Sequence, residues 1–364
     1  MGAQSTSTAT PLHLLRMTDG LIVHQALSAA AKLGIADLLK DGARSTTDLA
    51  ATLEVNDDAL YRTLRFLAGQ GVFHETAPRM FVNSALSHWL RSDVPGSVRS
   101  LLIYRGSPFY FSPFGDLLYS IQTGAPALEK AHGVTGFEYM RRNRDEGDMF
   151  DNAMTDVSML WAPGIVAAYD FGRWGWLMDV AGGNGLLLAT ILRAHPALRG
   201  VLADQPEVLE RARQREFWSP DLTGRVRFEP MDFFEAVPPG CRAYLMKNII
   251  HDWDDERARR ILLNCRRAVP DDGVLLLVEY CLGGENTPTV GKTVDVVMLT
   301  MTGGKERTVR EHRELLTSAG FSLNETVPLF AGCHDSGSET GVRPLLTRGS
   351  KPGRDLDGAV RGKG

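Results

Sequence analysis

The segment Asp179-Val-Ala-Gly-Gly-Asn-Gly185 joins an apolar run of strand length, Trp176–Val180, to a run with the apolar spacing of a helix. Glycines at such a strand-to-helix turn let the backbone approach a ligand closely, and open α/β sheets bind nucleotides at turns of this kind. Asp204 comes 19 residues after Gly185, at the end of the next apolar run. A carboxylate there accepts hydrogen bonds from a ribose diol. The segment therefore predicts a nucleotide-like cofactor at this turn.

The same features suit a dinucleotide-dependent dehydrogenase, so the glycine spacing has to discriminate. Counted from Gly183 and Gly185, the third glycine of the G-x-G-x-x-G fingerprint is replaced by Leu188. Gly182 and Gly183 are adjacent, and no loop for a pyrophosphate is evident. The spacing argues against a dinucleotide. The other alternative, a tight turn that binds nothing, is disfavoured by the position of Asp204.

From Trp174 onward, runs of strand length alternate with helical patterns. The predicted strands are Trp176–Val180, Gly200–Ala203, Val226–Glu229, Ala243–Asn248 and Val274–Glu279, and the helices span about 185–194, 206–215, 254–268 and 308–319. Such alternation is typical of a doubly wound, Rossmann-like parallel sheet of the α/β class, with helices on both faces.

The N-terminal region, 12–102, is helical first and then briefly extended. Ser45-Thr-Thr47 has residues typical of a helix cap. A second helix follows the turn at 55–58, and Val72–Val82 has the pattern of a hairpin. The order of helix, turn, helix and hairpin predicts a winged helix.

A length of 364 residues favours two domains. The predicted boundaries are 12–102 for the winged-helix-like domain, 103–170 for a helical linker and substrate lid, and 171–348 for the cofactor-binding domain. Residues 1–11 and 349–364 are rich in small and charged residues without periodicity, which is typical of mobile tails.

Composition bounds the partners and the compartment. A formal net charge of −4 and a pI near 6.2 leave no electrostatic footprint for nucleic acid or an anionic membrane. No apolar run reaches the roughly 18 residues of a membrane span, and the N-terminus lacks the pattern of a secretory signal. The four cysteines lie far apart without metal spacing, as expected of reduced, mostly buried thiols. We therefore expect a cytoplasmic protein with no nucleic-acid or membrane partner.

Several segments, in one consistent order, resemble the S-adenosylmethionine-dependent small-molecule O-methyltransferases, which include plant caffeate-type and bacterial polyketide-tailoring enzymes. They are Leu177–Gly185, Leu202–Val208, Met231–Phe234, Lys247–Asp255 and Gly303–Thr308, and the resemblance covers about residues 12–330. It implies methyl transfer from S-adenosylmethionine, which leaves S-adenosylhomocysteine, to a hydroxyl of a small aromatic molecule in secondary metabolism. We expect that hydroxyl to be phenolic. The resemblance also implies a homodimer built by the winged-helix domain, which closes the active site.

Position by position, the resemblance implies a set of cofactor contacts. Gly182 and the neighbouring backbone would face the methionine part, and Asp204 would hold the ribose. The adenine would lie against Asp232 and Phe233, with Trp253 packed on it. Lys247 would lie beside the site, and Ser158 falls where the family often places a cofactor contact.

His251 follows the predicted strand Ala243–Asn248, and strand ends in this architecture face the ligand crevice. A phenol with a pKa near 10 is a poor nucleophile at neutral pH, and a general base supplies about 10²–10⁴-fold. The resemblance places Glu279 and Glu306 beside His251, where negative charge favours the protonated imidazole and fixes its tautomer. Asp252 is a candidate supporting group. Asp254 and Asp255 are interpreted as helix caps.

The predicted substrate pocket is apolar, as suits an aromatic ring. Its candidates are Phe109, Met154, Trp161, Met298 and Met301. The alternative is that most of them are ordinary core residues, although Met154 and Met298 match family positions near the acceptor. No His and carboxylate array has good metal spacing, so we expect no metal ion and disfavour a metal-dependent mechanism.

Three alternatives stay open. Relatives on this scaffold methylate ring carbon, or carry out non-methylating chemistry such as hydroxylation. A ligand-responsive DNA-binding regulator is less favoured, because its would-be recognition helix at 59–68 offers Arg62 and Arg65 against Asp57 and Asp58. The chain also departs from the family after about residue 330, where the last strand, 342–346, is hard to register.

Overall fold

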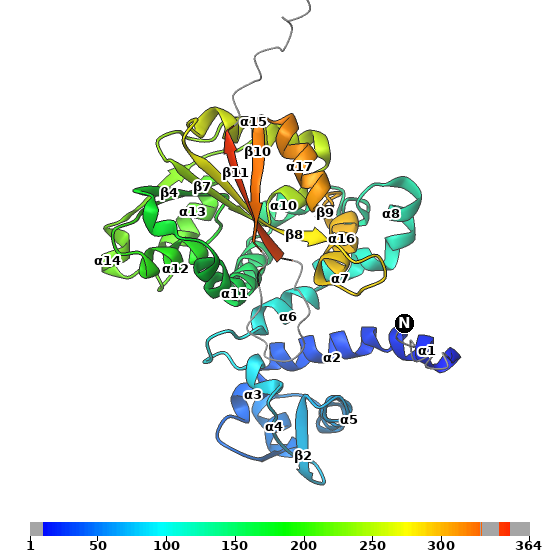
Figure 1. The fold of residues 1–364 in the computed structure, drawn as a ribbon. Coiled ribbons are helices and arrows are strands. Elements are labelled where there is room, and N and C mark those ends of the chain that lie inside the picture. Colours follow the sequence, from blue (N-terminus) through cyan, green and yellow to red (C-terminus); the bar gives the residue numbers. More distant parts are fainter. Residues whose placement is uncertain (1–9, 328, 330–341, 350–364) are drawn as a thin grey trace, which may run out of the picture. The chain divides into compact units, whose positions relative to one another are not determined.

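The computed structural model describes residues 10–327, 329 and 342–349. The chain forms two compact units, Met1–Phe111 with Asn143–Val157, and Ser112–Arg142 with Ser158–Gly364. The long helix α11 (Arg144–Ala168) therefore contributes to both units (Figure 1). The domain boundaries expected from the sequence remain a prediction, and most of both expected tails lies outside the described residues.

The first unit has the predicted winged-helix order. Its elements are α1 (Pro11–Thr18), α2 (Gly20–Leu33), α3 (Ile35–Leu38), β1 (Arg44–Ser45), α4 (Thr46–Leu53), α5 (Asp57–Gly69), β2 (Phe73–Ala77), β3 (Met80–Asn83), η1 (Ser87–Leu90), α6 (Arg99–Arg105) and α7 (Pro108–Phe111). The strands form a sheet in the order β1-β3-β2. The Ser45 hydroxyl accepts a hydrogen bond from the Asp48 N–H and caps α4, and the Asn56 side chain caps α5 in the same way.

The second unit is built on a sheet of order β10-β11-β8-β7-β4-β5-β6. The strands β4 (Trp176–Val180), β5 (Arg199–Asp204), β6 (Val226–Pro230), β7 (Ala243–Lys247) and β8 (Val274–Leu282) pair in parallel, as predicted. At one end β11 (Val342–Gly349) runs antiparallel to both β8 and β10 (Phe321–Thr326). The pairing of β11 with β8 gives the register of the last strand, which could not be assigned from the sequence: Val342 lies opposite Tyr280.

Helices cover both faces of this sheet. Besides the C-terminal part of α11, the helical elements of this unit are η2 (Ser112–Asp116), α8 (Leu117–Thr123), α9 (Ala127–His132), α10 (Gly136–Arg142), η3 (Phe171–Arg173), α12 (Leu186–Ala194), α13 (Pro206–Arg213), α14 (Pro220–Thr223), η4 (Ile250–Asp252), α15 (Asp255–Ala268), α16 (Val290–Met301) and α17 (Val309–Ser318), with the short strand β9 (Arg307–Thr308) beside β8. Alternate strand residues face opposite ways. Tyr244 packs in one core with Ile261 of α15, whereas Leu245 packs in the other with Leu188 of α12.

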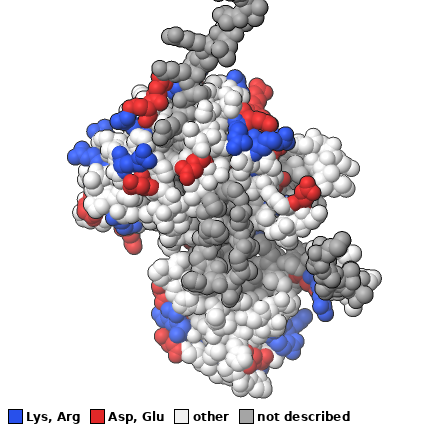
Figure 2. All heavy atoms as spheres, in the orientation of Figure 1, with Lys and Arg blue, Asp and Glu red and all other residues white. Residues whose placement is uncertain are grey.

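The helices, the surface charges and the cysteines can be compared with the expectations about membrane, nucleic acid and disulfides. No helix within the described residues is long and apolar enough to cross a membrane. Basic and acidic side chains intermix on the face of the molecule shown in Figure 2. Within the described residues, Cys241, Cys265 and Cys281 form no disulfide and are buried, as predicted, whereas Cys333 lies outside these residues.

Candidate active site

The glycine turn between β4 and α12 leaves no room for side chains at two positions. A Cβ atom on Gly182 would lie 2.5 Å from a Leu202 methyl and 2.6 Å from a carboxylate oxygen of Asp179. A Cβ atom on Gly185, whose φ is +81°, would lie 2.4 Å from the ring of Trp218. All three distances are shorter than a real Cβ atom allows, so glycine is required at both positions. Glycine at these two positions therefore lets the turn pack closely against Leu202, Asp179 and Trp218.

Asp204 is held against this turn at the end of β5. Its Oδ2 accepts a hydrogen bond from the Gly183 N–H at 2.8 Å, and its Oδ1 accepts one from the Gln205 N–H at 2.7 Å. Each carboxylate oxygen can accept more than one hydrogen bond. The predicted ribose-binding residue and the predicted glycine turn are thus brought together, with the carboxylate preorganised by two backbone amides.

Asp179 is a second acid at the turn, and the sequence analysis assigned it no role. It is buried, its Oδ2 has no hydrogen-bond partner among the described residues, and burial raises its pKa to about 7. Lys247, at the end of the neighbouring strand β7, is half-buried. Burial lowers the pKa of Lys247, and the charges of Asp179 and Glu279 oppose that shift. Asp179 is the first residue of the glycine segment 179–185, and this position was the signal from which a role in the site could have been predicted.

An aromatic cluster forms where the adenine was expected. The ring of Trp253 meets the edges of Phe234 at 4.7 Å and Phe233 at 6.0 Å, measured between ring centroids. Phe137 of α10 stacks on the same indole at 5.8 Å, a contact that the sequence did not suggest. Asp232 is exposed and accepts a hydrogen bond from the Phe234 N–H at 2.8 Å. Phe233 and Trp253 are therefore brought together, and Asp232 orders the turn that carries the two phenylalanines.

His251 lies in η4, directly after β7, with only 6% of its surface exposed. Its Nδ1 lies 2.6 Å from Oε1 of Glu306. Glu279, fully buried on β8, accepts hydrogen bonds from the N–H groups of Ile249 at 3.1 Å and Ile250 at 2.9 Å. The strand that carries Glu279 continues to Leu282, beyond its predicted end. The three residues that the resemblance placed together are thus side by side.

Burial dominates the electrostatics of these acids. It raises the pKa of Glu306 to about 9, with the nearby Asp295 adding to the shift and Arg307 opposing it. Burial also raises the pKa of Glu279, and it raises that of Asp252 to about 7. Asp252 Oδ1 lies 3.8 Å from His251 Nε2, beyond hydrogen-bonding distance. Of the two imidazole nitrogens, Nδ1 is engaged by Glu306.

His251, Glu279 and Glu306 also form a donor set that a metal ion could use, with one atom of each within 4.8 Å of the others. The short bond between His251 and Glu306 occupies two of these donors. A metal would have to displace that bond before it could bind. The expectation that no metal takes part remains a prediction.

The predicted pocket residues fall in both compact units. Met298 and Met301 are buried on α16, and Trp161 on α11 meets the edge of the Tyr280 ring at 6.3 Å. Tyr280 in turn stacks on His251 at 6.5 Å, which links Trp161 to the imidazole. Ser158, also on α11, is half-buried.

Phe109 and Met154 belong to the other unit. Phe109 is buried there beside Tyr104, with 6.4 Å between ring centroids, and Met154 is half-buried. Their expected contact with an acceptor remains a prediction.

Comparison with known proteins decides which family this site belongs to. Residues 114–322 match the model of the O-methyltransferase domain, and residues 15–93 match that of the O-methyltransferase dimerisation domain. The chain belongs to the O-methyltransferase family. Among its relatives, a phenazine O-methyltransferase from Lysobacter antibioticus is 39% identical and is aligned over 91% of this chain and 97% of its own.

Two other similarities show the range of the family. The 8-amino-8-demethylriboflavin N,N-dimethyltransferase of Streptomyces davaonensis is 35% identical over 82% of this chain and 86% of its own. A crystal structure of an O-methyltransferase from neocarzinostatin biosynthesis, in complex with S-adenosylmethionine and 2-hydroxy-5-methyl naphthoic acid, matches with a TM-score of 0.75. It is 30% identical and covers 90% of this chain and 96% of that one. This chain is therefore an S-adenosylmethionine-dependent O- or N-methyltransferase of secondary metabolism.

Proposed function

We propose that the enzyme methylates a phenolic hydroxyl of a small aromatic molecule, with Nε2 of His251 as the general base. The observation that carries the proposal is the 2.6 Å contact between His251 Nδ1 and Glu306 Oε1 in a buried site. When Nδ1–H donates to an ionised Glu306, the lone pair of Nε2 is left to accept the proton of an acceptor. The same carboxylate stabilises the imidazolium that forms.

The remaining residues of the site hold the base in place. Glu279 accepts hydrogen bonds from two consecutive backbone amides, those of Ile249 and Ile250, immediately before His251. The turn that carries the imidazole is therefore tied to β8. Such preorganisation matters because an in-line methyl transfer depends on the alignment of the reacting atoms. We expect positioning to contribute more to the rate than proton removal does.

The residues at the glycine turn suit S-adenosylmethionine, which supplies an electrophilic methyl group on a sulfonium when it is bound. We propose that the bare backbone at Gly182 faces its methionine part and that Asp204 binds its ribose. Phe233 and Trp253 would take the adenine beside Asp232. Lys247 and Ser158 are proposed to lie beside the cofactor. The Asp204 carboxylate, which accepts a hydrogen bond from the Gly183 N–H at 2.8 Å, lies at this turn and supports both assignments.

The buried base favours oxygen over nitrogen as the acceptor atom. A neutral aromatic amine is already nucleophilic, whereas a phenol has to lose a proton as it reacts. His251 and Glu306 supply that function, although a base would also serve carbon methylation beside a phenol. Trp161, Met298 and Met301 are proposed to line the acceptor pocket.

Product analysis tests this proposal. The enzyme should be incubated with labelled S-adenosylmethionine and a panel of paired hydroxy- and amino-substituted phenazines and naphthoates, and products identified by mass spectrometry and NMR. An aryl methyl ether from the hydroxy compounds is the expected result. Methylamines alone, or a new ring methyl group, would replace the proposed reaction by nitrogen or carbon methylation.

We also propose a homodimer formed through the first unit. Its two N-terminal helices expose an apolar set consisting of Leu12, Leu14, Leu15, Met17, Leu21 and Ile22, each at least 54% exposed. So many exposed large apolar side chains within residues 12–22 favour an interaction surface. The match of residues 15–93 to a dimerisation domain supports a second copy of the chain as its partner.

A further inference from the structure

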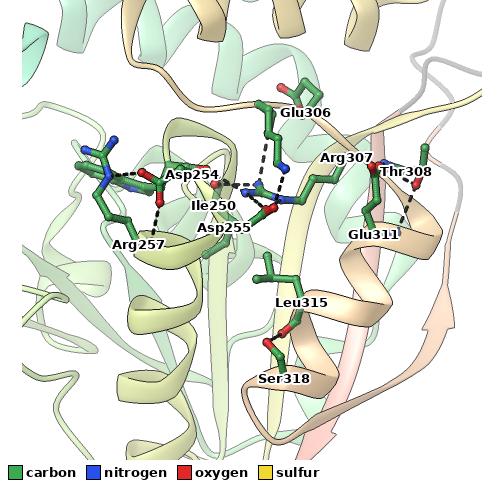
Figure 3. A network of polar contacts seen from close by, with 12 residues as sticks. Ile250, Asp254, Asp255, Arg257, Glu306, Arg307, Thr308, Glu311, Leu315 and Ser318 are labelled. Atoms are coloured by element: carbon green, nitrogen blue, oxygen red, sulfur yellow. Dashed lines mark hydrogen bonds and ion pairs between the residues drawn. The ribbon is translucent and has the colours of Figure 1, made fainter. Parts of the chain in front are cut away.

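Arg307, the residue after Glu306, carries a charged guanidinium that is almost completely buried, with 1% of the residue exposed. Its Nε and Nη2 donate to Asp255 Oδ1 at 3.0 and 2.8 Å (Figure 3). Nη2 also donates to the carbonyl of Trp253 at 2.9 Å, and Nη1 donates to the carbonyl of Ile250 at 3.2 Å. One side chain therefore binds three positions of the segment 250–255.

Two of these acceptors bracket the imidazole. The Ile250 carbonyl belongs to the residue immediately before His251, and Trp253 comes two residues after it. Gly304 approaches the same turn from its own segment, because a Cβ atom there would lie 2.0 Å from the carbonyl oxygen of His251. Gly304 and Arg307 thus both contact the segment 250–255. The backbone of Gly304 packs against the His251 carbonyl, and the guanidinium of Arg307 donates hydrogen bonds to Ile250, Trp253 and Asp255.

We propose that Arg307 is a positioning residue for the active site. By fixing the Ile250 and Trp253 carbonyls, it sets the imidazole against Glu306 and holds the Trp253 indole in the aromatic cluster. The inference rests on the proposed roles of His251 and Trp253. Arginine suits this task because its planar fork directs several donors at once, whereas lysine presents a single compact charge.

The competing interpretation is that Arg307 contributes only to fold stability. A purely structural role would lower the melting temperature of a variant but leave the geometry of its folded population unchanged. The hydrogen bond between His251 and Glu306 provides a readout of that geometry that needs no acceptor. In protein labelled with [15N]histidine, the Nδ1 proton in this short bond should give a strongly downfield resonance. If this resonance is absent from the spectrum of the His251→Ala variant, it belongs to His251.

The decisive variant is Arg307→Lys, and Lys305→Met is its matched control. Lys305 pairs with the same carboxylate, at 2.6 Å from Asp255 Oδ2, but its side chain is 45% exposed, and among the described residues it donates to no carbonyl of the segment 250–255. We expect Arg307→Lys to move the His251 resonance upfield or remove it. We also expect weaker binding of S-adenosylhomocysteine in calorimetry, by about 10-fold or more, since hydrogen bonds from a charged donor are lost. Lys305→Met should match the wild type in both measurements.

A folded Arg307→Lys protein with the wild-type resonance and wild-type affinity for S-adenosylhomocysteine would overturn the proposal. If that variant does not fold, Asp255→Asn decides, because it weakens the grip on Arg307 from an exposed position. A shifted His251 resonance in Asp255→Asn supports the positioning role, and an unchanged one contradicts it. The resonance reports geometry whether or not His251 is the base. Failure of the proposed function would therefore appear in turnover alone.

Discussion

Nδ1 of His251 and Oε1 of Glu306 lie 2.6 Å apart, although 55 residues separate them in sequence, and both side chains are buried. Burial raises the pKa of the Glu306 carboxyl to about 9, so this carboxyl keeps its proton to higher pH than an exposed one would. A protonated Glu306 donates to Nδ1, which leaves the ring's own proton on Nε2. Nε2 can act as a base only after Glu306 has lost its proton.

This relationship predicts the pH dependence of catalysis. With a phenolic acceptor, kcat/KM should rise by up to about tenfold per pH unit on the acid side and level off at alkaline pH. Glu306→Gln removes the carboxyl whose pKa is raised, so the rise should move to lower pH and reach a lower plateau. Initial rates of both proteins between pH 5.5 and 9.5 test this. Identical or flat profiles would contradict it.

Asp204 is predicted to bind the ribose of the cofactor. Losing a hydrogen bond to a charged group costs about 1.5–3 kcal/mol, so Asp204→Ala should bind S-adenosylmethionine roughly 10–150-fold more weakly in calorimetry. Glu210→Ala, an exposed acid on the neighbouring helix α13, should bind it as the wild type does. Unchanged affinity in Asp204→Ala would refute the ribose assignment.

Asp179 is predicted to make the ligand-free protein less stable as the pH rises. In the unfolded chain its carboxyl ionises near pH 4, but in the folded protein burial raises its pKa to about 7. The folded state therefore holds an extra proton between these values, and its stability falls across that window. Asp179→Asn lacks this loss, so relative to the wild type it should gain on the order of 3–4 kcal/mol between pH 4 and pH 8.

Urea unfolding at pH 4.5, 6 and 8 measures the difference between the two proteins. The exposed acid Asp58 supplies a control, because Asp58→Asn should follow the pH dependence of the wild type. If the stability difference between Asp179→Asn and the wild type were the same at every pH, the burial of an ionisable carboxyl would not be the cause.

The apolar set on α1 and α2 is predicted to hold the dimer. Obligate interfaces of this kind typically bury more than about 2,000 Å². Light scattering should therefore show a dimer at micromolar concentration, and Leu14→Glu combined with Met17→Glu should dissociate it. Val290→Glu places one such charge at an exposed valine of α16 and should leave the dimer intact. A monomeric wild type would remove the proposal.

The sheet core was predictable because parallel strands buried on both faces have near-continuous apolar runs. All five predicted strands are present, and β4 has the predicted bounds, Trp176–Val180. The helix α16 received no prediction, since its valines and threonines favour extended structure. In the folded protein it forms with Thr289 as its cap, whose side chain accepts a hydrogen bond from the Lys292 N–H. A last strand was expected at 342–346, but β10 and its antiparallel pairing with β11 were not, because such pairing depends on distant contacts.

In the candidate site, too, some residues were predictable from the sequence and others depend on contacts between distant segments. His251, Glu279 and Glu306 were grouped by resemblance, and the structure brings them together. Asp254 caps α15 as interpreted, by accepting a hydrogen bond from the Arg257 N–H at 2.8 Å. Asp255 was interpreted as a cap too, but its carboxylate pairs with Arg307 across 52 residues of sequence. No local sequence pattern predicts that Arg307 is buried and donates hydrogen bonds to the segment 250–255.

The most direct test of the central claim is the turnover of His251→Ala, measured beside its affinity for S-adenosylmethionine. The assay should use an acceptor identified by product analysis, at pH 7 and again at pH 9.5. We expect nearly unchanged cofactor affinity and a fall in kcat of about 10²-fold or more at pH 7. Part of the rate should return at pH 9.5, where the solvent supplies the phenolate. A His251→Ala enzyme that turns over at the wild-type rate at pH 7 would show that the acceptor loses its proton in another way.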